Sequence, residues 1–305
     1  MEEKKDKVIF ILGPTAVGKS FVSVSLAKKI NGEIISADSV QIFKGLDIGS
    51  AKVTKDEMGG IVHHAIDICE PEDSFTVFDF VEYTKKKIKE ICARGKLPIV
   101  VGGTGLYVKA LTQGFNFGGV DKDENLRQKL EQIADEKGND ALFEMLKEKD
   151  VSLAEKTDRF NRVRLVRALE IAFLKGEKIT SSVEFESLLI VLTKPREELY
   201  QAINVRVDKM IEDGLVQEVE GLKRRGLSEE NQSMHAIGYK EVLAFLDGKI
   251  AKDEMISLVK QHSRNYAKRQ MTFLRGMKDV HMVDMQNVTD GLMEVEKLVG
   301  EYLKK

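Results

Sequence analysis

Residues 13–20 read GPTAVGKS and fit the pattern G-x-x-x-x-G-K-[ST] at every position. The segment follows an apolar run, residues 8–12, and precedes a helical pattern, which is the context of a phosphate-binding loop. Glycines let backbone N–H groups approach phosphate oxygens, and a helix N-terminus adds a partial positive charge. The segment therefore predicts a site for a ligand that carries phosphate groups.

Side chains of this loop offer two further contacts. Lys19 can place its charge against a terminal phosphate, and the Ser20 hydroxyl can ligate Mg²⁺. An aspartate that ends a neighbouring strand and supports the magnesium is not evident, because residues 99–101 run into Gly-Gly-Thr. This mismatch disfavours plain ATP hydrolysis and leaves room for a loop that holds a diphosphate. The predicted diphosphate ligands within the loop are Gly13, Thr15, Ala16, Val17, Gly18, Lys19 and Ser20.

Two further loops are expected beside this one. In parallel α/β sheets the ligand crevice lies just beyond the carboxyl ends of the strands, which places residues 38–41 and 102–105 there. Asp38 could act as a general base or support magnesium, but it could equally cap a turn. Thr104 could present its hydroxyl to a substrate, cap the following helix, or do both. The sequence alone leaves these roles open.

Basic residues gather in two helical segments. Residues 260–278 carry six basic side chains and no acidic one, and a second group lies within nine residues. Such segments can bind an RNA backbone, although a solvated helix face is the ordinary alternative. The second group consists of Arg159, Arg162, Arg164 and Arg167.

The elements that must hold these residues follow from apolar periodicity. Buried strands are expected at 8–12, 33–37, 97–101 and 187–192, and helices at 20–30 and 78–91. Strands that alternate with helices indicate an α/β fold with a P-loop-type parallel sheet flanked by helices.

The character of the chain changes after Gly118. Residues 119–185 are mostly helical and highly charged, with short apolar stripes, whereas strand character returns afterwards. We therefore expect a helical insertion domain at 119–185, within a core formed by 1–118 and 186–305. Residues 196–305 read as a series of amphipathic helices.

Composition excludes several classes of protein. The 305 residues are 32% charged and 42% hydrophobic with a net charge of −2, which is typical of a globular domain. No apolar run approaches the roughly 20 residues that span a bilayer. Residues 1–7 are charged and lack the apolar stretch of a signal peptide, so a cytoplasmic protein is expected. Two cysteines, Cys69 and Cys92, are too few for a disulfide framework or a four-cysteine zinc site.

Seven segments together resemble the bacterial tRNA dimethylallyltransferase family, and the resemblance spans nearly the whole chain. DSVQIFKGLDIGSAK and YAKRQMTFLR are the most particular of the shared stretches, since GPTAVGKS occurs in many P-loop proteins. The segments are GPTAVGKS (13–20), ISADSVQIFKGLDIGSAK (35–52), VGGTGLYVKAL (101–111), RLVRALEI (164–171), INVRVDKMIEDGLVQEV (203–219), AIGYKE (236–241) and YAKRQMTFLR (266–275).

The resemblance implies a prenyl transfer. The phosphate loop, with Arg206 and Mg²⁺, would hold the diphosphate of dimethylallyl diphosphate. Asp38 would act as general base on N6 of the adenosine 3′ to the anticodon, in tRNAs that read codons beginning with U. Thr104 would lie where the two substrates meet. The expected partners are the tRNA anticodon stem-loop and the prenyl donor, with no membrane and a monomeric chain.

The resemblance also implies a set of tRNA contacts, drawn from the predicted insertion and from three loops of the core. They are Asp38, Ser39, Val40, Gln41, Thr104, Arg127, Val163, Arg164, Leu165, Val166, Arg167, His235, Ala236, Ile237, Gly238, Tyr239 and Lys240.

Two alternatives remain at this point. The phosphate loop is also compatible with an ATP-dependent small-molecule kinase of the P-loop class, which would transfer a phosphoryl group to a small alcohol. A non-catalytic RNA-binding protein could instead use a nucleotide as a switch, and its RNA affinity would then differ between ATP and ADP.

Overall fold

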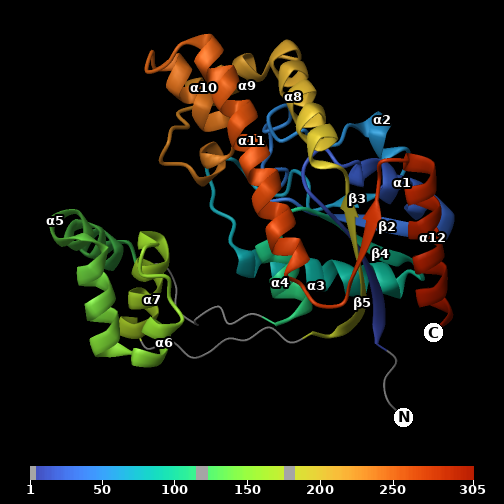
Figure 1. Cartoon of the computed structure of the whole chain (residues 1–305), viewed down its shortest axis with the longest axis horizontal. Coiled ribbons are helices and arrows are strands. Elements are labelled where there is room, and N and C mark those ends of the chain that lie inside the picture. The colour runs from blue at the N-terminus through green and yellow to red at the C-terminus, as the bar shows by residue number, and fades with distance from the viewer. Residues whose placement is uncertain (1–4, 115–122, 175–182) are drawn as a thin grey trace. The chain divides into compact units, whose positions relative to one another are not determined.

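The computed structural model describes residues 5–114, 123–174 and 183–305, and the chain forms two compact units (Figure 1). One unit comprises Met1–Thr112 with Val183–Lys305, and the other comprises Gln113–Ser182. Phe185, which the sequence assigns to the insertion, is instead the first residue of a core strand.

The larger unit is built on a parallel six-stranded sheet in the order β3-β2-β4-β1-β5-β6. The α/β fold and the four predicted strands are confirmed. The strands are β1 (Asp6–Leu12), β2 (Gly32–Ala37), β3 (His63–His64), β4 (Leu97–Gly102), β5 (Phe185–Thr193) and β6 (Val280–Asp284).

The two edge strands are absent from the sequence-based assignment. The segment that forms β6 was assigned to amphipathic helices, and this assignment is wrong. An edge strand need not carry a continuous apolar run, because one of its sides faces solvent. His281 and Met282 are accordingly exposed, and β3 is only two residues long.

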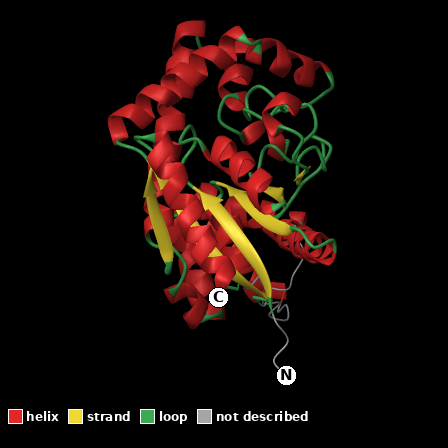
Figure 2. Cartoon of the chain, turned by 90° about the vertical axis from the view of Figure 1, so that its right-hand side faces the viewer, coloured by secondary structure: helices red, strands yellow, loops and turns green. Residues whose placement is uncertain are grey.

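Helices cover both faces of this sheet (Figure 2). Ile9 and Ile11 of β1 pack with Val295 of α12 (Val288–Lys304) and the apolar side of α1 (Lys19–Ile30), while Phe10 points to the opposite face and stacks on Phe185. Among the helices that the structure describes, none is both long enough and apolar enough to cross a bilayer. The helices of this unit are α1 (Lys19–Ile30), α2 (Lys55–Met58), α3 (Val77–Ala93), α4 (Gly105–Thr112), α8 (Arg196–Glu212), α9 (Leu215–Arg224), α10 (Tyr239–Leu246), α11 (Lys252–Arg275) and α12 (Val288–Lys304).

The smaller unit is helical, with α5 (Glu124–Lys149), α6 (Val151–Glu155) and α7 (Arg162–Leu174) around a core of its own. Gly138, at φ 78°, interrupts α5 and separates the two apolar stripes seen in the sequence. Val163, an apolar residue of α7, is 75% exposed and does not join this core.

Strand register places the candidate loops together. Gly102 at the end of β4 pairs with Leu12 of β1 on one side and with Ala37 of β2 on the other. The segments that follow these three strands therefore leave the sheet at one edge, as the sequence predicted. The approach is close, since a Cβ on Gly102 would lie 2.2 Å from the carbonyl oxygen of Ala37.

We expect Gly102→Ala to destabilise the larger unit by at least about 1–3 kcal/mol, because the methyl group collides with backbone that cannot rotate away. Urea unfolding followed by circular dichroism measures the change. The matched control is Gly300→Ala in α12, where a Cβ meets nothing within 4 Å. That variant should be more stable than the parent by about 0.5–1 kcal/mol, since alanine is the better helix former. Equal stability of the two variants would contradict this account.

Candidate functional site

A cavity of about 620 Å³ lies where β1, β2 and β4 end. Its lining includes five phosphate-loop residues, namely Thr15, Ala16, Gly18, Lys19 and Ser20. Gly18 caps the N-terminus of α1 in a left-handed conformation, at φ 103°, which favours glycine. Of the remaining predicted ligands, Val17 is 2% exposed and packs in the sheet core, and Gly13 packs against Leu192.

Two cations face this cavity. Lys19 Nζ donates a hydrogen bond to the Pro14 carbonyl at 2.7 Å, and Arg206 Nη1 of α8 donates to the Thr15 hydroxyl at 3.2 Å. Burial and the charge of Arg206 lower the pKa of Lys19 to about 8, although Asp38 opposes the shift. Burial also lowers the pKa of Arg206. Two desolvated cations held by neutral oxygens form a site that favours a multivalent anion.

Asp38, the first residue after β2, lines the same cavity. Its Oδ1 accepts backbone N–H groups of Val40 at 2.9 Å and Gln41 at 3.3 Å, so the turn-capping role is present. Its charge partly offsets the lowering of the pKa of both Lys19 and Arg206, so the carboxylate lies within electrostatic range of the two cations. Asp38 thus caps its turn with one oxygen and faces the cavity as well.

The side chain of Gln41 makes hydrogen bonds within the protein. Its Oε1 accepts the Ser36 hydroxyl at 3.2 Å, and its Nε2 donates to the carbonyls of Ser50 and Ala51 at 3.3 and 3.2 Å. Gln41 therefore joins the Asp38 loop to the following loop. Ser39, Val40 and Gln41 all line the cavity.

Glu218 on α9 holds that following loop in turn. Its carboxylate accepts backbone N–H groups of Asp47, Ile48 and Gly49 at 2.7–3.1 Å, and the Tyr239 hydroxyl at 2.7 Å. Sequence reasoning missed this contact, because 170 residues separate the partners. The only signal was the inclusion of both segments in the resemblance.

Thr104 precedes α4. Its carbonyl accepts the N–H groups of Tyr107 and Val108, as at the start of any helix, whereas its hydroxyl caps no backbone N–H group of the described residues. Its hydroxyl is buried, and among the described side chains it interacts with the phenol of Tyr266. Gly102, Gly103 and Tyr266 line the cavity nearby. Burial and then the charge of Asp38 raise the pKa of Tyr266 to about 12, so the phenol stays protonated at neutral pH.

The predicted tRNA contacts of the core divide into two groups. His235, Ala236, Ile237 and Lys240 line the cavity. Gly238 and Tyr239 do not, since both are buried and the Tyr239 ring packs against Gly49. Tyr239 therefore supports, through Glu218, the loop that contains residues 47–49, and its side chain is not available to a ligand.

In the helical unit, Glu170 of α7 organises the arginines. Arg127 donates to both carboxylate oxygens of Glu170 at 2.9 and 2.8 Å, and Arg167 adds a further ion pair. Burial would raise the pKa of Glu170, but these hydrogen bonds outweigh it and lower the pKa to about 2. Leu165 and Val166 face the core of this unit.

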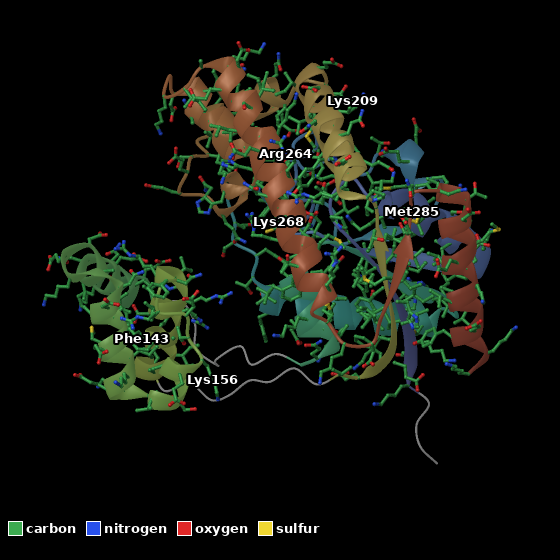
Figure 3. All side chains as sticks on the ribbon, in the orientation of Figure 1. Phe143, Lys156, Lys209, Arg264, Lys268 and Met285 are labelled. Carbon is green, nitrogen blue, oxygen red and sulfur yellow. The ribbon has the colours of Figure 1, made fainter. Side chains whose placement is uncertain are left out.

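The two predicted basic segments differ in what their side chains contact. On α11, Lys260 pairs with Asp208 and Arg264 donates to Asn204, whereas Lys268 and Arg269 are exposed (Figure 3). Arg164 on α7 is exposed as well. The α11 segment is thus partly tied to α8 and partly free to meet a ligand backbone.

The site suits a magnesium ion that arrives with phosphate. The Ser20 hydroxyl and the Asp38 carboxylate both line the cavity, and both are hard oxygen donors. Within the described residues, no group of three or more His, Cys, Asp or Glu side chains could cage a metal. A cation that takes most of its ligands from a diphosphate and water fits this donor set.

Comparisons with known proteins agree along the chain. The family model described as IPP transferase matches residues 41–277. The tRNA dimethylallyltransferase of Oceanobacillus iheyensis is 47% identical over 289 residues, which cover 92% of both chains. That of Bacillus mycoides is 46% identical over 297 residues and covers 95% of this chain and 92% of its own.

Solved structures give the same result. A tRNA isopentenylpyrophosphate transferase from Bacillus halodurans has a TM-score of 0.76 and 43% identity, covering 98% of this chain and 97% of its own. A eukaryotic dimethylallyltransferase acting on tRNA has a TM-score of 0.76 and 30% identity, covering 93% of this chain and 75% of its own.

The lowered pKa of Lys19 predicts how anion binding depends on pH. A diphosphate stabilises the charged lysine, so affinity for inorganic diphosphate should be steady below pH 8 and fall above it, by up to about tenfold per pH unit. Isothermal titration calorimetry between pH 6.5 and 9.5 measures this. Lys19→Arg should lack the fall because arginine stays charged. Lys209→Arg, at an exposed lysine of α8, should keep it. A parallel fall in all three proteins would place the titration elsewhere.

Proposed function

The chain belongs to the IPP transferase family, and we propose that it transfers the dimethylallyl group of dimethylallyl diphosphate to N6 of the adenosine 3′ to the anticodon. It is a prenyltransferase that acts on tRNA. The observation that supports the site assignment is that the two cations Lys19 and Arg206 line one cavity together with the carboxylate of Asp38. Two cations match a diphosphate leaving group, and a carboxylate beside them matches a base.

Asp38 can activate the acceptor, which is the adenine of the tRNA. The adenine N6 is a poor nucleophile because its lone pair is delocalised into the ring. As the N6–C1 bond forms, the allylic C1–O bond breaks and its electron pair leaves with the diphosphate. Asp38 accepts the N6 proton, which keeps the nitrogen from building up positive charge.

The phosphate loop can stabilise the diphosphate that leaves the prenyl donor. The leaving diphosphate gains charge as the C–O bond breaks, and Lys19, Arg206 and the loop amides can stabilise that charge. Mg²⁺, held at Ser20, would neutralise part of the diphosphate charge. Pro14 and Thr15 hold the two cations in place before the ligand arrives, so little reorganisation is needed.

The RNA must present an unstacked base. The reacting groups lie inside a cavity, and a base stacked in an anticodon loop cannot reach them, so the adenosine must be flipped out. Loop nucleotides permit this at modest cost. The exposed Lys268, Arg269 and Arg164 are suited to the RNA backbone. We further propose that tRNAs reading codons beginning with U are the substrates, and that a single chain acts in the cytoplasm.

Mass spectrometry tests the transfer directly. The protein is incubated with Mg²⁺, dimethylallyl diphosphate and an unmodified tRNA that has adenosine 3′ of its anticodon, with ATP as the parallel donor. We expect one five-carbon prenyl unit on that nucleoside, and no reaction with ATP. An unmodified tRNA, with ADP released as a small alcohol is phosphorylated, would replace this proposal by the kinase.

Asp38→Asn tests the base. The amide oxygen can still accept the N–H groups of Val40 and Gln41, so the turn should persist while proton transfer is lost. We expect turnover to fall by a factor of about 10²–10⁴, with tRNA affinity within a few fold of the parent. Asp73→Asn, at an exposed carboxylate outside the cavity, is the control and should leave both unchanged. A tenfold loss of tRNA affinity with intact turnover would refute the general-base role.

A further inference from the structure

Gln270 of α11 connects two of the loops that line the cavity. Its side chain is 6% exposed. Its Oε1 accepts the backbone N–H of Thr15 in the phosphate loop at 3.0 Å, and its Nε2 donates to the carbonyl of Gly103 at 3.1 Å. One carboxamide thus joins the loop after β1 to the loop after β4. Both loops precede it in sequence, by 255 and 167 residues.

Neighbouring residues are fitted to this bridge. A Cβ on Gly103 would lie 2.2 Å from Gln270 Nε2 and 2.9 Å from the Gly13 carbonyl, so the close approach requires glycine there. The Thr15 hydroxyl accepts Arg206, and Thr104 follows Gly103 directly. Gln270 therefore fixes the backbone beside an anion-facing cation and beside the buried Thr104 hydroxyl.

The chemistry of the bridge calls for an amide. Thr15 offers an N–H and Gly103 offers a carbonyl, so the group between them must accept at one end and donate at the other. A carboxylate can do only the first, and a methyl group can do neither. The two loops follow β1 and β4, which are neighbouring parallel strands. The bridge therefore sets the separation of the two loops beside the cavity.

We propose that Gln270 is a positioning residue that fixes the distance between the phosphate loop and the Gly103–Thr104 loop. This inference rests on the proposed function, because these loops face the prenyl donor and the acceptor adenine. Misplacement of reacting groups by about 1 Å can cost roughly 10²-fold in rate. Gln270 itself lines the cavity beside Tyr266, and the role proposed for it is exerted through the two loops that it bridges.

Two variants with a control test the proposal. Q270A removes both hydrogen bonds, and Q270E keeps the acceptor but loses the donor. Gln261 is exposed on the same helix, so Q261A is the matched control. The readouts are kcat and KM for both substrates between pH 5.5 and 8.5, and hydrogen–deuterium exchange of a peptide that covers residues 13–20.

For Q270A we expect kcat to fall by roughly 10–100-fold, with KM for tRNA within a few fold, because the basic face of α11 is unchanged. Exchange in the 13–20 peptide should rise in Q270A and stay unchanged in Q261A. For Q270E, protonation restores the donor to Gly103, so its kcat relative to the parent should increase as pH falls. A general loss of folding would not give this pH-dependent rescue.

Three outcomes would overturn the proposal: unchanged kcat in Q270A, unchanged exchange in its phosphate-loop peptide, or a pH-independent ratio for Q270E. The proposed function fails separately. If the parent protein prenylates no tRNA, that function is lost, whereas the exchange comparison of Q270A with Q261A still decides whether the bridge fixes the phosphate loop.

Discussion

The arrangement of the larger unit follows from one electrostatic constraint, which is that two cations share a desolvated cavity. Lys19 and Arg206 repel each other, and burial disfavours the charge of both, so bringing the two charges together in the cavity costs free energy. The fold sustains this cost by placing Lys19 at the start of α1 and Arg206 on α8, each fixed by a neutral oxygen of the same loop. A bound diphosphate removes the penalty. The electrostatic cost of placing the two cations together thereby contributes to affinity for the diphosphate that must leave.

The remaining functional side chains depend on ties between distant segments. Asp38 is held by hydrogen bonds within its own turn, and Gln41 joins that turn to the next loop. Glu218 binds the backbone of this next loop, and Tyr239 donates a hydrogen bond to Glu218. Gln270 provides the equivalent tie on the other side of the cavity. These contacts place polar groups of α9, α10 and α11 against loops that would otherwise be held only by the strands before them. The helices that follow β5 therefore complete the site as well as cover it.

The difference between local sequence patterns and contacts between distant segments explains what the sequence could predict. The phosphate loop has a fixed spacing, and buried central strands are apolar runs, so both were identified from residue type alone. The place of Asp38 and Thr104 at one sheet edge followed from topology. Gln270 and Glu218 could not be found in this way, because a glutamine or glutamate on an amphipathic helix has no pattern that distinguishes a buried bridge from a solvated side chain. Strand β6 could not be predicted for a related reason, since an exposed edge strand lacks the apolar run that is typical of a central strand. Roles of Asp38, Thr104 and the tRNA contacts stay predictions.

The steric requirements of β4 also explain why no aspartate follows that strand. Gly102 lies against Ala37, and Gly103 lies against Gln270 and Gly13, so neither position has space for a side chain. A carboxylate that supports a metal ion from the end of β4 is thereby excluded on geometric grounds. The acidic group of the cavity is instead Asp38, one strand away, where it faces both cations. A carboxylate at that position can take a proton from a nucleophile that approaches the donor carbon, because it lies beside the leaving group's cations. The same phosphate-loop framework is in this way suited to breaking a carbon–oxygen bond of a diphosphate ester, with the phosphates retained as the leaving group.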